Sequence, residues 1–204
     1  MSNNPRPLAR QVVSVATTTL YLVRHAHADW GPDDARPLSE AGRSAARTVT
    51  ELLSTFPIIA IYSSPARRSI ETISDLAERV GLRPAVIPDL RERELPALPA
   101  GDFERVVQES WNAPTTAAAR RESNGAAQTR ALSLVRQLVI RHAGQHLVIA
   151  THGNLLALIL NGLDPAFGYE FWRQLSFPEV YELQLDGVTM VSVRRIWKQV
   201  AGDT

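Results

Sequence analysis

Three short apolar runs in this chain each end in residues that can hold or attack a phosphate group. The runs are Thr18–Val23 before Arg24 and His25, Ile58–Tyr62 shortly before Arg68, and Leu147–Ala150 before His152 and Gly153. Short apolar runs bounded by polar residues are typical of buried strands. Ligands of open α/β sheets bind in the crevice at the carboxyl ends of the strands. The pattern therefore predicts a phosphate site at one edge of a sheet.

The predicted strands alternate with segments of helical spacing. Helices are expected after the caps Ser39, Ser64 and Asp102, from Ala127 to Val139 with a stop at Gly144, and from Asn154 to Asn161. The first amides of the last helix would be available to an anion. Arg83–Pro88 is expected as a short edge strand, because prolines limit its pairing. Val180–Leu185 and Val188–Val193 flank Asp186-Gly187, a strong hairpin signal. The order predicts an α/β fold: a three-layer α/β/α sandwich with a mostly parallel central sheet and a C-terminal antiparallel hairpin.

The bulk composition is that of an ordinary globular domain. Of the 204 residues, 45% are hydrophobic and 21% charged, with a formal net charge of +1. This balance gives no reason to expect nucleic-acid binding, and no apolar run is long enough for a membrane span. There are no cysteines, which excludes disulfides and thiolate chemistry. We expect a flexible tail over residues 1–17, a single domain over residues 18–204 and, without a convincing signal peptide, a cytoplasmic protein.

Several blocks of the sequence resemble the histidine phosphatase superfamily, the phosphoglycerate-mutase-like enzymes. Leu22–Ala26 resembles the family's Arg-His-Gly signature, Ser63–Thr72 its second block, Leu90-Arg91-Glu92 the block with its acid/base glutamate, and Thr151-His152-Gly153 the block with its second histidine. In the second block, Arg68 falls at the family's phosphate-binding arginine. The blocks follow the family's order, and the resemblance covers Leu20 to the C-terminus.

The resemblance implies a metal-independent phosphomonoester hydrolase that forms a phosphohistidine on His25. An unprotonated imidazole can attack phosphorus, and neighbouring arginines disfavour its charged form. The phosphate-binding residues implied are Arg24, Arg68, His152 and Gly153, of which His152 also stabilises the transferring oxygens. Glu92 would protonate the leaving oxygen and then activate water. No cofactor is implied, and the partner is a small phosphorylated substrate.

Some positions depart from the family pattern. Ala26 replaces a glycine, Gly31 stands where mutases carry a phosphate-binding asparagine, and proline-rich sequence follows Glu92 where a glycine is usual. The segment between Glu92 and Thr151 is short, which favours a phosphatase over a mutase. Glu94 lies two residues on and is an alternative general acid. The sequence does not choose among sugar phosphates, nucleotides and phosphoproteins, and it leaves the oligomeric state open.

Two other interpretations come from different classes of protein. His25, His27 and Asp29 spell the H-x-H-x-D opening of a metal-dependent hydrolase, and zinc binds closely spaced histidines. Against this, Trp30 stands where that motif has a further histidine, and Arg24 would lie beside the dication. The other alternative is a non-catalytic relative that binds a phosphorylated ligand, which the presence of both histidines and both arginines disfavours.

Overall fold

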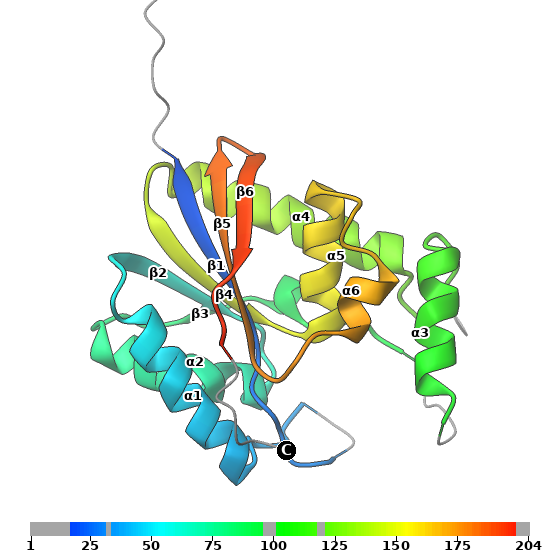
Figure 1. Cartoon of the computed structure of the whole chain (residues 1–204), viewed down its shortest axis with the longest axis horizontal. Coiled ribbons are helices and arrows are strands. Elements are labelled where there is room, and N and C mark those ends of the chain that lie inside the picture. Colours follow the sequence, from blue (N-terminus) through cyan, green and yellow to red (C-terminus); the bar gives the residue numbers. More distant parts are fainter. Residues whose placement is uncertain (1–16, 32–33, 96–100, 118–120, 199–204) are drawn as a thin grey trace, which may run out of the picture.

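The structure, a computed structural model, describes residues 17–31, 34–95, 101–117 and 121–198 around a six-stranded sheet (Figure 1). The strands are β1 (Thr18–Arg24), β2 (Ile58–Ser63), β3 (Ala85–Val86), β4 (His146–Thr151), β5 (Glu179–Asp186) and β6 (Thr189–Arg195), in the spatial order β3-β2-β4-β1-β5-β6. β1 to β4 pair in parallel, whereas β5 and β6 are antiparallel. The predicted sheet with its terminal hairpin is thereby confirmed. Apart from Thr17, the expected tail lies outside the described residues.

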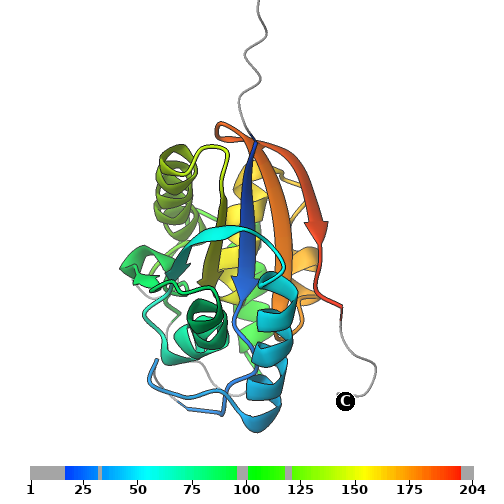
Figure 2. The same ribbon diagram turned by 90° about the vertical axis from the view of Figure 1, so that its left-hand side faces the viewer.

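Helices connect the strands and cover both faces of the sheet. They are α1 (Glu40–Leu53), α2 (Arg67–Arg79), the short 3₁₀ helix η1 (Pro88–Leu90), α3 (Phe103–Asn112), α4 (Asn124–Arg141), α5 (Gly153–Leu163) and α6 (Tyr169–Arg173). Figure 2 shows α1 and α2 on one side of the sheet, with α4 and α5 on the other. No helix is predicted at α6, because its five residues are too few to show helical periodicity.

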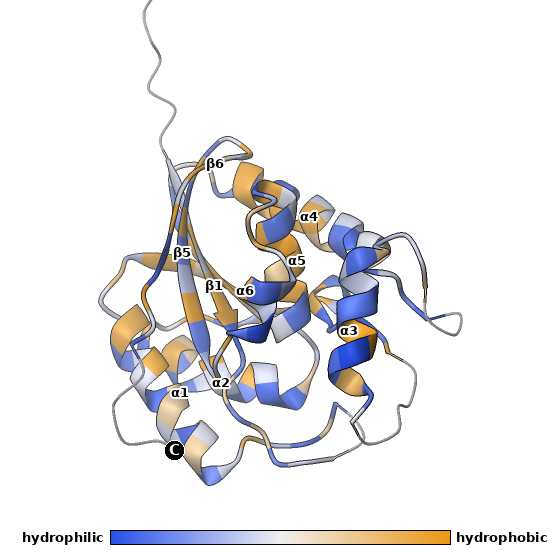
Figure 3. Cartoon of the chain, turned by 45° about the vertical axis from the view of Figure 1, so that its right-hand side comes forward, coloured by the Kyte–Doolittle hydropathy of each residue, from blue (hydrophilic) through white to orange (hydrophobic). Residues whose placement is uncertain are grey.

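The two faces of β1 contribute to different halves of the core. Leu20 and Leu22 pack with residues of α4 and α5, whereas Tyr21 and Val23 pack with residues of α1 and α2. Burial on both faces explains why the strand is a continuous apolar run without alternation. Figure 3 shows apolar residues on α5 and mostly polar ones on α3 at the edge of the molecule. The predicted three layers are confirmed.

The start of α2 differs from the sequence prediction. Ser64 was expected to cap the helix with Pro65 at its first position, but α2 begins at Arg67, after Ala66. The reason is that the amide of Ser64 still pairs in the sheet, where it donates to the Ala150 carbonyl at 2.9 Å. Its hydroxyl accepts from the Ala66 amide at 3.3 Å and also contacts Nε2 of His152 at 2.7 Å.

Two further local predictions are adjusted. Asp102 precedes α3 as expected, but its carboxylate pairs with Arg105 at 3.1 Å and does not cap the helix. In the hairpin, Asp186 pairs with Thr189, so the two turn residues are Gly187 and Val188, one position later than predicted. Gly187 has a φ of 56°, a left-handed conformation that favours glycine.

Gly42, in the first turn of α1, holds this helix against the loop that follows β1. Its amide donates to the Ser39 hydroxyl at 3.0 Å, which confirms the predicted cap. A Cβ on Gly42 would collide with the carbonyl oxygen of His27, two residues after His25. The close approach therefore requires glycine here.

We predict that Gly42→Ala destabilises the protein, although alanine normally favours a helix. The collision with the His27 carbonyl should lower the free energy of unfolding by about 1–3 kcal/mol, as overpacking does elsewhere. Urea unfolding measures this, with Gly168→Ala as the control because a Cβ there meets nothing within 4 Å. An increase in the free energy of unfolding for Gly42→Ala would contradict this prediction, because it would show that the loop after β1 moves aside at little cost.

Candidate active site

The parallel strands bring the predicted site residues to one edge of the sheet. Arg24 at the end of β1 pairs with Thr151 at the end of β4, and Ser63 at the end of β2 pairs with Ala150. The amide of His25 then donates to the Thr151 carbonyl at 3.0 Å, which continues the pairing beyond β1. The residues that follow these strands therefore lie side by side, as the strand pattern predicted.

His25 is buried, with 5% of its surface exposed, and both ring nitrogens have partners. Nδ1 lies 2.7 Å from the carbonyl oxygen of Ala26. A carbonyl only accepts, so Nδ1 must carry the proton and donate it. Nε2 accepts from Nε–H of Arg68 at 3.2 Å. This tautomer points the lone pair of Nε2 at the arginine, where an anionic group would be held.

His152 lies at the opposite side of the same arginine. Its Nδ1 accepts from Nη2 of Arg68 at 3.1 Å, so the proton is on Nε2, which donates to the Ser64 hydroxyl at 2.7 Å. The rings of His25 and His152 meet edge to face, with centroids 5.1 Å apart. A single guanidinium therefore bridges both histidines. The Ser64 hydroxyl fixes the other nitrogen of His152, Nε2.

The environment keeps both imidazoles neutral. The pKa of His25 is lowered from its ordinary 6.5 to about 3, mainly by burial and also by the charges of Arg68, Arg24 and Arg36, while the Ala26 hydrogen bond opposes this shift. Burial also lowers the pKa of His152 well below 6.5, again with help from the neighbouring charges. The neutral His25 expected of a nucleophile is the form that this site favours.

Arg24 is partly buried and lies against the loop before β5. Its Nη1 donates to the carbonyls of Leu175 at 2.7 Å and Ser176 at 3.2 Å, and its Cζ lies 3.4 Å from the centroid of the Phe177 ring. Burial lowers its pKa to about 10. Nε of Arg24 is buried without a hydrogen-bond partner in the structure, so a donor remains for a ligand.

Gly153 has a structural reason to be glycine. A Cβ at this position would lie 2.8 Å from both Cζ and Nε of Arg24, so any side chain would displace the guanidinium. The sequence predicted Gly153 as a phosphate-binding residue through its amide. The structure shows in addition that its missing side chain makes room for Arg24.

Glu92 lies at the N-terminus of α5, directly beyond His152. Its Oε2 accepts from the amide of Asn154 at 3.0 Å, and its Oε1 accepts from the amides of Leu155 at 3.0 Å and Arg93 at 2.8 Å. The sequence predicted that the first amides of this helix would be open to an external anion. That prediction is wrong for Asn154 and Leu155, because the carboxylate of Glu92 occupies them.

Glu94, the alternative acid, has different neighbours. Its carboxylate is exposed and lies 3.9 Å from Arg91 and 3.6 Å from Arg121. Neither arginine belongs to the group around His25. The structure therefore places Glu92 beside the second histidine and Glu94 among surface charges.

The residues of the metal-site alternative do not converge. His27 is exposed, and its Nδ1 lies 2.9 Å from the Ser39 hydroxyl. Both nitrogens of His25 are engaged by Ala26 and Arg68. Within the described ranges, no group of three or more His, Asp or Glu side chains is arranged to hold a metal ion.

Sequence reasoning missed residues that complete the site. A cavity of about 250 Å³ is lined by His25, His27, Ala28, Trp30, Arg36 and Phe177. Arg36 belongs to a segment that was read only as a polar loop, yet its charge lowers the pKa of both buried histidines. Thr72 was also missed: its hydroxyl accepts from the Ala26 amide at 3.0 Å and fixes the backbone after His25. Neither residue belongs to an apolar strand-end pattern.

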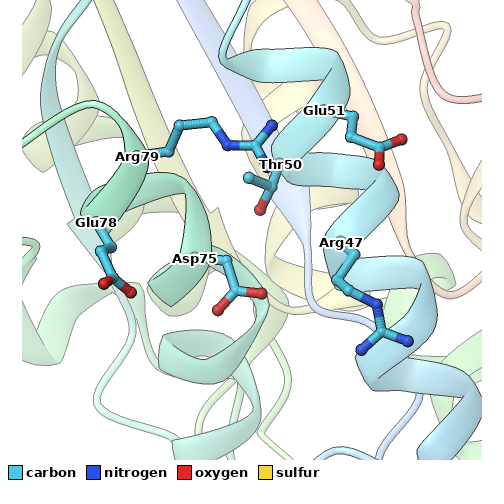
Figure 4. A pocket seen from close by; sticks show the side chains of 6 residues that line it. All are labelled: Arg47, Thr50, Glu51, Asp75, Glu78 and Arg79. Atoms are coloured by element: carbon cyan, nitrogen blue, oxygen red, sulfur yellow. The ribbon is translucent and has the colours of Figure 1, made fainter.

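A larger cavity lies elsewhere and has none of this chemistry. It measures about 370 Å³ and lies between α1 and α2. Figure 4 shows its lining of both charge signs, drawn from both helices: Arg47, Thr50, Glu51, Asp75, Glu78 and Arg79. No histidine lines it, and the cavity at His25 is therefore the candidate active site despite its smaller volume.

We predict that the His25 imidazole stays neutral at pH 5. The pKa of His25 is about 3 in the folded protein and about 6.5 in the unfolded chain, so the unfolded chain takes up the proton first as the pH falls. The free energy of unfolding therefore decreases as the pH drops from about 6.5 to about 3. NMR of the imidazole nitrogens reports the protonation state directly. Titration of His25 with a midpoint near pH 6.5 would contradict this account of the site.

Comparison with solved structures finds proteins with a similar fold. A mycobacterial glucosyl-3-phosphoglycerate phosphatase is 25% identical, with a TM-score of 0.71 over 88% of this chain and 97% of that chain. The Bacillus stearothermophilus protein YhfR is also 25% identical, with a TM-score of 0.71 over 92% of this chain and 98% of that chain. An Entamoeba histolytica phosphoserine phosphatase variant, solved with phosphoserine, shares the fold at 18% identity and a TM-score of 0.68, over 86% of this chain and 96% of that chain.

A search of curated proteins finds no match. The family model described as histidine phosphatase superfamily (branch 1) matches residues 20–194. That range runs from β1 to β6 and includes every residue placed at the strand ends above. The chain therefore belongs to the histidine phosphatase superfamily.

Proposed function

We propose that this protein hydrolyses small phosphomonoesters through a phosphohistidine on Nε2 of His25, without a metal ion. The observation that carries the proposal is the guanidinium of Arg68, which contacts Nε2 of His25 at 3.2 Å and Nδ1 of His152 at 3.1 Å. A permanent, planar cation between two neutral imidazoles suits a phosphoryl group that the first attacks and the second stabilises. The phosphatases among the similar structures support the same reaction class.

In the first step, the phosphoryl group enters between His25 and Arg68, so that the Nε–H of Arg68 turns from Nε2 of His25 to a phosphoryl oxygen. The freed lone pair of Nε2 attacks phosphorus and the bond to the leaving oxygen breaks. The proton stays on Nδ1, and its hydrogen bond to the Ala26 carbonyl stabilises the positive charge that develops on the ring. Arg68 and Arg24 balance the charge of the phosphoryl oxygens, and His152, whose Nδ1 accepts from Nη2 of Arg68, holds that guanidinium beside them. In the second step, water attacks phosphorus and the P–N bond breaks, which releases inorganic phosphate and restores His25.

Glu92 is the proposed proton donor to the leaving oxygen and the base for the water. A carboxylate offers about four lone-pair positions, and backbone amides fill two on Oε1 and one on Oε2. The remaining position on Oε2 is where a catalytic proton would reside. The amides hold the carboxylate in one orientation, as a general acid requires. The surroundings of Glu94 include no comparable anchor.

The non-catalytic alternative has less support. A protein that only binds a phosphorylated ligand needs arginines, but it does not need a nucleophile held neutral with a defined tautomer. His25 has both features, since Ala26 fixes its proton and burial lowers its pKa. The proposal includes the small phosphorylated substrate and the cytoplasmic location that the sequence predicts.

The first experiment compares hydrolysis of p-nitrophenyl phosphate by the wild type and by His25→Ala, each with and without EDTA. We predict that the wild type is active with EDTA, and that His25→Ala loses roughly 10³-fold or more in kcat, as loss of a nucleophile does. His146→Ala is the matched control, because His146 lies at the other end of β4. Loss of wild-type activity with EDTA would favour the metal-dependent alternative. Retained activity in His25→Ala would end the phosphohistidine mechanism.

The second experiment separates Glu92 from Glu94. For Glu92→Gln we predict a loss of about 10²-fold in kcat with alkyl phosphates, but of about tenfold or less with aryl phosphates, whose leaving groups need little protonation. Glu94→Gln is the matched control and should behave like the wild type. Equal losses with both substrate types would show that Glu92 is not the acid, and a selective loss in Glu94→Gln would move the role there.

A further inference from the structure

The guanidinium of Arg68 has a third partner that the proposed reaction does not use. Its Nη1 pairs with Oδ1 of Asp34 at 2.9 Å. The arginine side chain is 6% exposed, whereas the aspartate side chain is 63% exposed. A buried cation that must bind phosphate is therefore held from outside by a carboxylate of the loop after β1.

The carboxylate contacts the side of the guanidinium that faces away from the histidines. In a planar guanidinium, Nε–H and one N–H of Nη2 lie parallel along one edge, and Nη1 lies outside that edge. In Arg68, this edge contacts His25 through Nε and His152 through Nη2. Asp34 contacts Nη1 alone.

The same protein shows how its arginines bind an oxyanion with that edge. Arg194 donates from Nε and Nη2 to the two carboxylate oxygens of Glu182, at 2.7 and 2.8 Å. Arg195 uses the same two nitrogens for Glu179, at 2.7 and 2.8 Å. The edge of Arg68 that Asp34 does not contact, and that meets the two histidines, is thus the edge with which arginines bind oxyanions bidentately.

The backbone fixes where Asp34 lies. Its carbonyl accepts from the amide of Arg67 at 2.8 Å, at the first residue of α2. Farther along the loop, the amide of Leu38 donates to Glu71 of α2 at 2.7 Å. The segment from Asp34 to Leu38 is therefore attached to α2 at both ends. Arg68 is the second residue of this helix, so the loop sets the distance between Asp34 and Arg68.

We propose that Asp34 is a positioning residue, which holds Nη1 of Arg68 so that its Nε–Nη2 edge faces the phosphoryl group. The inference rests on the proposed function of Arg68 in phosphate binding. A rival role is that of an internal competitor, in which the carboxylate of Asp34 occupies the arginine until phosphate displaces it. The two roles predict opposite effects on phosphate affinity, because loss of a competitor tightens binding and loss of a positioning group weakens it.

The experiment measures inhibition of p-nitrophenyl phosphate hydrolysis by inorganic phosphate and by orthovanadate in Asp34→Ala and Asp34→Asn. For Asp34→Ala we expect both inhibition constants to rise roughly tenfold and kcat/KM to fall by about the same factor, because the phosphate-binding arginine would be misplaced. Asp34→Asn keeps an oxygen acceptor at the same place without the charge, so it should stay within about threefold of the wild type. The Asp34 side chain is 63% exposed and Arg68 keeps both histidine partners without it, so thermal unfolding should hardly change.

Asp186→Asn is the matched control, since Asp186 lies in the hairpin at the far end of the sheet from His25. Tighter inhibition in either variant would establish the competitor role and overturn the proposal. Unchanged inhibition constants in Asp34→Ala would overturn the proposal too. So would an equal rise of the inhibition constants in Asp34→Ala and Asp34→Asn, because the hydrogen bond to Nη1 would then not be what positions Arg68. An inactive wild type that also fails to bind phosphate would instead refute the proposed function itself.

Discussion

The site depends on one interaction, the contact of a permanently charged guanidinium with two buried imidazoles. Arg68 cannot lose its proton, so His25 and His152 must present lone pairs to it and stay neutral. Burial acts in the same direction, because it penalises the charged form of a histidine. The second nitrogen of each ring then finds a fixed partner, the Ala26 carbonyl for His25 and the Ser64 hydroxyl for His152. The tautomers follow from this single constraint.

The sheet supplies the geometry that this interaction requires. β4 lies between β2 and β1, so the residues after all three parallel strands are neighbours although they are far apart in the sequence. Both faces of the central strands are buried under helices, which keeps the strand ends in register. Gly153 then allows Arg24 to lie against the start of α5, and Glu92 binds the amides of that helix. The site is rigid because each group is held by an element of the core.

Much of the fold and part of the site could be predicted from the sequence, for a physical reason. Strands buried on both faces are continuous apolar runs, so the polar residues that follow them stand out in the sequence. His25 and His152 come directly after such runs, and Arg68 comes a few residues after one. Arg36 and Asp34 belong to a loop without periodicity, and only the folded chain shows that this loop is attached to α2. The helix start at Ser64 was misplaced because a Ser-Pro pair suits a cap as well as a strand end.

The contacts of Glu92 were beyond the sequence for a different reason. A helix N-terminus after a histidine predicts open amides, and nothing local shows that a carboxylate about 60 residues earlier occupies them. In the same way, the Phe177 ring over Arg24 comes from the segment before β5. Contacts between residues this far apart depend on how the layers pack, which local patterns do not encode.

The most direct test of the account is to trap the covalent intermediate. The protein is mixed with a ³²P-labelled phosphomonoester, denatured in alkali within milliseconds and digested, and the labelled peptide is identified by mass spectrometry. The account predicts a label that survives alkali, is lost in acid as a P–N bond requires, and maps to His25. A label on another residue, or turnover of excess substrate in which no quench time traps any label on the protein, would contradict it.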